Sequence, residues 1–163
     1  YVNDTGNQVV TLGKSAAAFH LLKKGKSIPA SLKKAFFEPV SQLKKAQKIA
    51  PFANAMQDIS DGLASEIRHI CEQSKAGAII FSDNLPIKEE VRKAAKRIGK
   101  KPEDMALNGG EEFELVYTIP EKNLNKAKGY LVGEITRKKG VRTHSRGKEK
   151  TLKRFGFDHF LKA

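Results

Sequence analysis

The stretch ANAMQDISDGLASEIRHICEQSKAGAIIF, residues 53–81, decides the fold because it joins a strand, a helix and a second strand. A short strand is expected over residues 53–56, and the apolar run at 78–81 is typical of a buried strand. Between them, apolar residues recur at the spacing of one buried helical face: Leu63, Ile67, Ile70 and Cys71. This spacing predicts a helix over residues 62–74. Strands and helices that share one core predict a layered α+β or α/β domain.

The rest of the chain alternates helical and extended patterns. Helices are expected over residues 15–24, 31–37, 41–49, 87–98 and 102–107. Strands are expected over residues 9–12, 112–119 and 130–135. A basic hairpin is expected around Gly140. Since no internal repeat or low-complexity linker divides the chain, we expect one domain over residues 1–163.

The composition is that of a globular protein, with 39 % hydrophobic and 30 % charged residues. No apolar run approaches the roughly 20 residues that span a bilayer. The first residues lack the basic and apolar segments of a secretory signal. Cys71 is the only cysteine, which excludes an internal disulfide and a cysteine-rich zinc site and predicts a small core residue. These features favour a cytoplasmic protein without a membrane partner.

A formal net charge of +13 raises the question of a nucleic-acid partner. The lysines and arginines are spread over the whole length, and aromatic residues do not interleave with them as a base-stacking platform requires. A solvated basic surface that attracts phosphate-bearing ligands is therefore favoured over nucleic-acid binding. A basic nucleic-acid-binding module stays the alternative from another functional class.

The segment Gly13-Lys14-Ser15 stands between an expected strand and an expected helix, as in a phosphate-binding P-loop. That motif needs another glycine five residues before its Gly-Lys-Ser, and Gln8 occupies the position. We interpret the segment as a strand-to-helix turn in which the Ser15 side chain caps the helix.

The first of two acidic turns is Asp58-Ile59-Ser60-Asp61-Gly62. Asp58 and Asp61 are close along a tight turn, so both carboxylates can face one point. Mg²⁺ prefers a few hard carboxylate oxygens together with water and substrate phosphates. Ser60 and the amides at the helix start are suited to a phosphate or nucleotide group. The structural alternative is that Ser60 or Asp61 only caps the helix.

The second acidic turn is Asn108-Gly109-Gly110-Glu111-Glu112-Phe113-Glu114-Leu115. Its paired glycines let the backbone turn sharply and approach a ligand closely. Its three glutamates are unusual in so basic a chain. The structural alternative is a loop before an edge strand with an acidic face. Together, the two turns favour magnesium- and nucleotide-dependent phosphotransfer.

With these motifs the chain resembles the carboxyl-terminal half of thiamine-monophosphate kinase, in the superfamily of aminoimidazole ribonucleotide synthetase and selenophosphate synthetase. The segments that carry the resemblance are Leu12-Gly13-Lys14-Ser15-Ala16-Ala17, Asp58-Ile59-Ser60-Asp61-Gly62-Leu63, Gly109-Gly110-Glu111-Glu112-Phe113-Glu114-Leu115 and Gly156-Phe157-Asp158-His159-Phe160. Relatives outside the kinase branch carry a glycine-richer turn in place of Ser60-Asp61. The resemblance implies a three-layer α/β/α domain of the α+β class with a mixed sheet, like the carboxyl-terminal domain of aminoimidazole ribonucleotide synthetase.

The resemblance implies transfer of the γ-phosphoryl group of ATP to thiamine monophosphate, which gives thiamine diphosphate. Asp58 and Asp61 would ligate Mg²⁺, and Ser60 would contact ATP. Glu111 would touch the thiamine part of the substrate, and Phe157 would pack an aromatic ring nearby. No residue receives a covalent role, because phosphoryl transfer needs positioning and charge neutralisation. The enzymatic alternative is another ATP-using member of the superfamily.

The chain departs from the family pattern at particular positions. Lys14 and Glu112 stand where the family usually has aspartate, and Phe157 stands where tyrosine is more usual. The last change removes a hydroxyl that could bond to the substrate. The family's amino-terminal half supplies most metal-binding aspartates and the dimer interface. We expect residue 1 to lie inside a longer natural chain and the full-length protein to be a homodimer. The amino-terminal half belongs either to the same natural chain or to a separate one, and we expect this chain alone to have negligible turnover.

Overall fold

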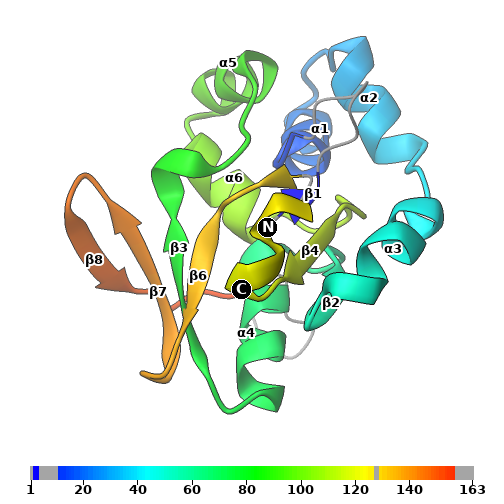
Figure 1. Cartoon of the computed structure of the whole chain (residues 1–163). Helices are drawn as coiled ribbons and strands as arrows, with labels where there is room; N and C mark the ends of the chain where they lie inside the picture. The colour runs from blue at the N-terminus through cyan, green and yellow to red at the C-terminus, as the bar shows by residue number, and fades with distance from the viewer. Residues whose placement is uncertain (1, 4–10, 127–128, 157–163) are drawn as a thin grey trace.

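The computed structural model describes residues 2–3, 11–126 and 129–156 (Figure 1). Its helices are α1 (Lys14–Lys23), α2 (Ala30–Phe37), α3 (Leu43–Ile49), α4 (Leu63–Gln73), α5 (Glu89–Ile98) and α6 (Pro102–Asn108), with short 3-10 helices η1 (Ala50–Phe52), η2 (Ser82–Asn84) and η3 (Glu121–Lys126). Its strands are β1 (Val2–Asn3), β2 (Ala55–Asp58), β3 (Gly77–Phe81), β4 (Leu115–Thr118), β5 (Gly129–Tyr130), β6 (Gly133–Thr136), β7 (Gly140–Ser145) and β8 (Lys148–Thr151). In the described ranges, no helix has the length and apolarity that crossing a membrane requires.

The strands form two four-stranded sheets, ordered β2-β4-β1-β5 and β6-β3-β7-β8. The first sheet is antiparallel, whereas the second is mixed because β3 and β7 run parallel. The strand expected over 130–135 is divided, so that its two parts join different sheets. Between them, the Val132 carbonyl still accepts a hydrogen bond from the Phe81 N–H at 2.8 Å. The expected α+β class with a mixed sheet is confirmed.

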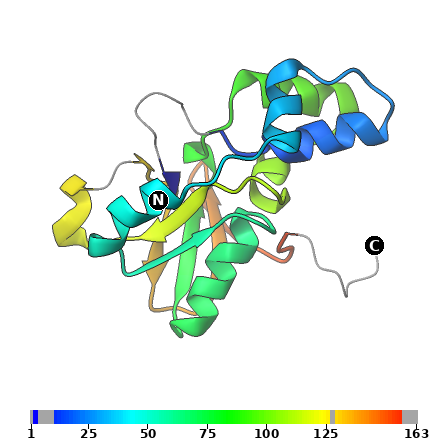
Figure 2. The same ribbon diagram turned by 90° about the vertical axis from the view of Figure 1, so that its right-hand side faces the viewer.

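Helices α1, α2, α4, α5 and α6 pack in two places (Figures 1 and 2), while α3 packs against β4 through Ile49. Helices α1, α2, α5 and α6 lie together at one end of the sheets, around a cluster that includes Leu21, Leu32, Val91 and Ile98. Helix α4 packs against β3 and β7 and covers the larger core. Its apolar face is buried as the spacing predicts: Leu63, Ile67, Ile70 and Cys71. The core role expected for Cys71 is therefore confirmed.

Three predictions about strands differ from the structure, and one of these strands lies partly outside the described residues. The strand expected over 112–119 begins only at Leu115, since the residues before it belong to a turn. The hairpin expected around Gly140 lies instead between β7 and β8, at 146–147. It cannot form at Gly140 because β6 and β7 lie on opposite sides of β3. In the strand expected over 9–12, residues 11–12 belong to no strand, and residues 9–10 lie outside the described residues.

Candidate functional site

The first acidic turn connects β2 to α4. Asp58 ends β2 and is exposed, whereas Ser60 and Asp61 are half-buried. Ile59 between them is fully buried and anchors the turn in the core. The turn therefore presents polar side chains at the surface while one apolar side chain holds its backbone in place.

The second acidic turn follows α6 and has an unusual backbone. Glu111 and Phe113 have φ angles of 59° and 52°, in the left-handed region that side chains other than glycine rarely adopt. Gly110 lies so close to the first turn that a Cβ atom there would be 2.6 Å from the carbonyl oxygen of Ser60. Such a conformation persists only where the surrounding structure holds it.

Backbone hydrogen bonds join the two acidic turns directly. The Glu111 N–H donates to the Ser60 carbonyl at 2.7 Å, and the Phe113 N–H donates to the Ile59 carbonyl at 2.9 Å. In the other direction, the Ile59 N–H donates to the Glu114 carbonyl at 2.8 Å. The turns meet because β2 and β4 are antiparallel with Asp58 opposite Leu115, which puts the end of one strand beside the start of the other. The structure thus brings together Asp58, Ser60, Asp61 and Glu111, as a shared site requires.

The segment after β8 also reaches the first turn. The Gly156 N–H donates to Asn108 Oδ1 at 3.1 Å, and a side chain at Gly156 would overlap the Asp61 carbonyl. The Arg68 guanidinium on α4 lies 4.8 Å from the centre of the Phe155 ring, and this contact holds the segment after β8 close to α4. The predicted substrate residue Phe157 lies outside the described residues, as do residues 158–160. Its immediate neighbour in the chain is nevertheless packed against Asp61.

Glu112 serves the start of α1, which corrects the expectation for Ser15. The Ser15 N–H donates to Glu112 Oε1 at 3.0 Å, while the Ser15 side chain does not cap the helix. The helix start carries unpaired N–H groups and partial positive charge, so a carboxylate is a suitable cap. Burial nevertheless dominates and raises the pKa of Glu112 to about 8, although the Ser15 and Gly13 N–H groups act in the opposite direction. Lys14 pairs with Glu90 at 3.2 Å instead of contributing to a P-loop.

Glu66 was not identified from the sequence. It lies in the first turn of α4 with no exposed surface, and its Oε1 accepts a hydrogen bond from the Asp61 N–H at 3.0 Å. The Ser60 hydroxyl donates to the same oxygen at 3.2 Å. The available signal was an acidic residue directly before Ile67 on the buried face of the expected helix. Apolar periodicity alone does not distinguish it from an exposed glutamate.

The proposed metal ligands suit a hard cation. Within the described part of the chain, neither Asp58 nor Asp61 is in an ion pair, so both carboxylates are available to a cation. Across the same residues, no group of three or more histidine, cysteine, aspartate or glutamate side chains is placed to hold a metal. The donor set fits Mg²⁺, which takes one or two carboxylates and completes its shell with water and substrate phosphates.

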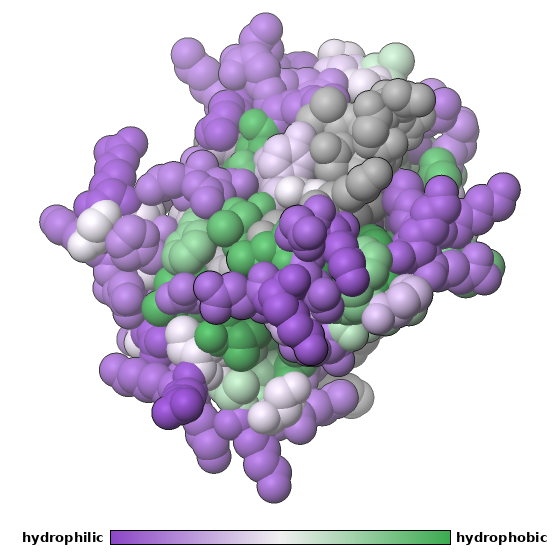
Figure 3. Space-filling view, viewed as in Figure 1, coloured by the Kyte–Doolittle hydropathy of each residue, from purple (hydrophilic) through white to green (hydrophobic). Residues whose placement is uncertain are grey.

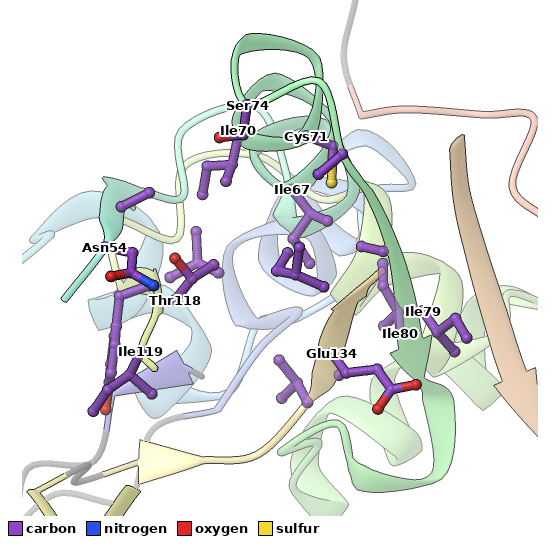
Figure 4. A pocket seen from close by; sticks show the side chains of 18 of the residues that line it. Asn54, Ile67, Ile70, Cys71, Ser74, Ile79, Ile80, Thr118, Ile119 and Glu134 are labelled. Atoms are coloured by element: carbon purple, nitrogen blue, oxygen red, sulfur yellow. The ribbon is translucent and has the colours of Figure 1, made fainter. Parts of the chain in front are cut away.

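Two hollows differ in their relation to the turns. A groove of about 560 Å³ adjoins the site, where Asp58 and Phe113 line it together with Met56, Val40 and Leu43. A larger cavity of about 690 Å³ lies between α4 and the strands (Figure 4), and of the described site residues neither the first-turn residues Asp58, Ser60 and Asp61 nor Glu111 lines it. Apolar surface gathers on the face shown in Figure 3, where polar side chains surround it. The larger cavity is therefore separate from the acidic turns.

Comparison with known proteins identifies the family. The model of the family described as AIR synthase related protein, C-terminal domain, matches residues 6–145. The thiamine-monophosphate kinase of Pyrococcus horikoshii is 34 % identical over 150 residues, which are 91 % of this chain and 47 % of the relative. That of Buchnera aphidicola subsp. Schizaphis graminum is 34 % identical over 173 residues, or 96 % of this chain and 51 % of the relative. The chain thus spans about half the length of the curated relatives it matches.

This chain is also similar to a solved structure. The structure described as AaThiL complexed with AMPPCP and TMP has a TM-score of 0.81 and 29 % sequence identity, and the match covers 98 % of this chain and 50 % of that chain. The resemblance to thiamine-monophosphate kinase inferred from the four motifs is confirmed. The chain belongs to the AIR synthase related protein family, as a carboxyl-terminal domain.

Proposed function

We propose that this chain is the carboxyl-terminal half of a cytoplasmic thiamine-monophosphate kinase, which transfers the γ-phosphoryl group of ATP to thiamine monophosphate. The missing amino-terminal half would complete the active site, and the full-length protein would be a homodimer. One observation carries the proposal: the hydrogen bonds between Glu111 and Ser60 and between Phe113 and Ile59 join the two acidic turns into one site. The relatives of matching sequence support the substrate assignment.

Among the described site residues, the observed positions support the following proposed roles. Asp58 and Asp61 would hold Mg²⁺, which neutralises the phosphate charge when bound. Ser60 lies between them and would contact ATP. Glu111 is exposed beside Ser60 and would contact the thiamine part, and Phe157 would pack against an aromatic ring of the substrate.

The reaction requires these residues to position two anions. An oxygen of the acceptor phosphate forms a bond to the γ-phosphorus of ATP, and the bond from that phosphorus to the β–γ bridging oxygen breaks, so ADP leaves. No covalent protein intermediate is needed, because phosphoryl transfer depends on alignment and charge stabilisation. The backbone bonds between the turns would keep the nucleotide and thiamine contacts at a fixed separation.

The test supplies the amino-terminal half in the same chain. The protein receives Mg-ATP and thiamine monophosphate, and thiamine diphosphate is followed by chromatography. Product that disappears in Asp58→Asn but persists in Glu38→Gln would support the kinase, since Glu38 is an exposed acidic residue that lies after α2 and outside both turns.

Other outcomes would redirect the proposal. A folded protein that binds ATP but makes no thiamine diphosphate would point to another ATP-using reaction of the superfamily. A steeply salt-dependent affinity for generic RNA that Asp58→Asn does not change would favour the nucleic-acid-binding alternative.

A further inference from the structure

The carboxylate of Glu66 is the hydrogen-bond centre beneath the first acidic turn. Its Oε1 accepts from the Ser60 hydroxyl at 3.2 Å and from the Asp61 N–H at 3.0 Å. Its Oε2 accepts from the Gln57 side-chain amide and lies 3.3 Å from His69 Nδ1. One oxygen thus holds the turn, while the other connects it to β2 and to the next turn of α4.

Glu66 is buried at a position where an apolar side chain would be the simpler solution. An ionised carboxylate removed from water is costly unless it is paired and fully hydrogen-bonded. Here donors meet both oxygens, and half-exposed His69 pairs with it when protonated. Such buried polar groups are weak sources of stability compared with apolar residues of similar size. The arrangement therefore calls for a role other than stability.

The contacts of Glu66 Oε1 indicate that this role is to orient the first acidic turn. The Ser60 hydroxyl and the Asp61 backbone both lie in the turn, so the position of Oε1 fixes the orientation of both residues. Hydrogen-bond partners behind metal ligands are known to orient those ligands and to tune metal affinity.

We propose that Glu66 is a positioning residue that sets the metal affinity of the first acidic turn through Ser60 and Asp61. This inference rests on the proposed role of Asp58 and Asp61 as ligands of Mg²⁺. Glu66 itself touches neither substrate nor metal. Its effect on the reaction passes through the conformation of the turn.

The test uses the full-length enzyme with Glu66 replaced in two ways. Glu66→Leu removes both acceptor oxygens, whereas Glu66→Gln keeps the size and one acceptor oxygen but puts an amide NH₂ group in place of the other oxygen. Metal binding is measured directly with Mn²⁺ by electron paramagnetic resonance in the absence of substrates. The kinase assay adds the half-saturating Mg²⁺ concentration, kcat and the KM for thiamine monophosphate.

Glu66→Leu is expected to weaken Mn²⁺ binding and raise the half-saturating Mg²⁺ concentration by about tenfold. Glu66→Gln is expected to lie between Glu66→Leu and the parent protein. The KM for thiamine monophosphate should change less than the metal affinity in both variants, because the residues proposed to contact the thiamine part belong to other segments and only adjoin this turn.

Two controls separate positioning from stability. Glu89→Leu and Glu89→Gln make the same changes at an exposed glutamate in the first turn of α5, away from both acidic turns, and should leave metal binding unchanged. Ile70→Ala weakens the core beneath α4 without touching the turn. It should lower the melting temperature but leave Mn²⁺ affinity intact once the protein is folded.

A folded Glu66→Leu protein with unchanged Mn²⁺ affinity and Mg²⁺ dependence would overturn the proposal. If that variant does not fold, Glu66→Gln decides, and unchanged metal binding there would also overturn it. A parent protein that binds Mn²⁺ but does not phosphorylate thiamine monophosphate would refute only the proposed function. The Mn²⁺ comparison would then still decide the role of Glu66.

Discussion

The backbone N–H of Glu111 donates to the carbonyl oxygen of Ser60 over 2.7 Å, and this bond joins two motifs that are far apart in the sequence. It places the residue proposed to contact nucleotide beside the residue proposed to contact the thiamine group. Glu111 adopts a φ of 59° in making it. Strained backbone of this kind concentrates at ligand sites, so the geometry and the proposed function agree.

Gly110→Ala should separate the two turns. Its Cβ would lie 2.6 Å from the Ser60 carbonyl, a distance that forces one turn to move. We expect a loss of stability of about 1–3 kcal/mol, the usual cost of overpacking, together with loss of kinase activity in the full-length enzyme. Urea denaturation and thiamine diphosphate formation measure the two effects.

Gly25→Ala is the matched control for that variant. Gly25 has a φ of 62° but no heavy atom within 4 Å of a Cβ placed there, so alanine is strained without touching the site. It should lower stability and leave kcat unchanged. Equal activity in both variants would show that contact between the turns is not needed for catalysis.

Glu112→Gln should change how stability depends on pH. Burial raises the pKa of Glu112 from 4.5 to about 8, so the folded protein retains a proton that the unfolded chain releases between these values. The stabilising contribution of this protonation is complete below pH 4.5 and is lost as the pH rises through about 8. The variant, which cannot ionise, should therefore lose less stability than the parent protein over that range.

Urea denaturation at a series of pH values measures this difference. Glu121→Gln provides the comparison, because Glu121 is exposed in η3. It should follow the pH dependence of the parent protein. Parallel curves for the parent and Glu112→Gln would mean that Glu112 is ionised in the folded state at neutral pH.

Cys71 should be unreactive in the folded protein. Its side chain is only 3 % exposed, and burial raises the pKa of its thiol, so little thiolate is present at neutral pH. An aromatic disulfide reagent should label it slowly in the native state and completely in urea. Rapid native labelling would instead show that the cavity beside α4 opens to Cys71 Sγ.

The chain of 163 residues alone should have negligible kinase turnover. Its described residues offer the two aspartates of one turn but no cluster of three metal-binding side chains. The measurement is thiamine diphosphate formation by the purified chain, compared with the same chain joined to an amino-terminal half. Robust turnover by the isolated chain would contradict the proposed division of the active site between two halves.

The sequence predicted the elements better than their contacts. Helix α4 was predicted because its apolar residues repeat at helical spacing, and all of those on the predicted face are buried. The meeting of the acidic turns depends on the pairing of Asp58 with Leu115 across β2 and β4. Periodicity determines which face of a strand is buried but does not identify its partner or its register. The acidic residues of the two turns therefore suggested a shared site, but the sequence did not show where the two turns meet.

The errors in the second turn have a physical cause. The alternation from Glu112 onward is typical of a strand, yet Phe113 takes a left-handed φ and bonds to Ile59. Tertiary hydrogen bonds thus override local propensity at this point. The same turn supplies Glu112 as the acceptor for α1, a contact between distant segments that no local capping rule includes. The Ser15 prediction failed because that rule considers only residues next to the helix.

The packing of Gly156 against Asp61 has a consequence for synthesis on the ribosome. The chain emerges from its amino end, so the two acidic turns can pair once β4 is available, before β7 and β8 exist. The contact at Asp61 must wait until the residues of both strands have been synthesised. A nascent chain that stalls after Thr151 would therefore carry joined turns without the contact between Gly156 and Asp61.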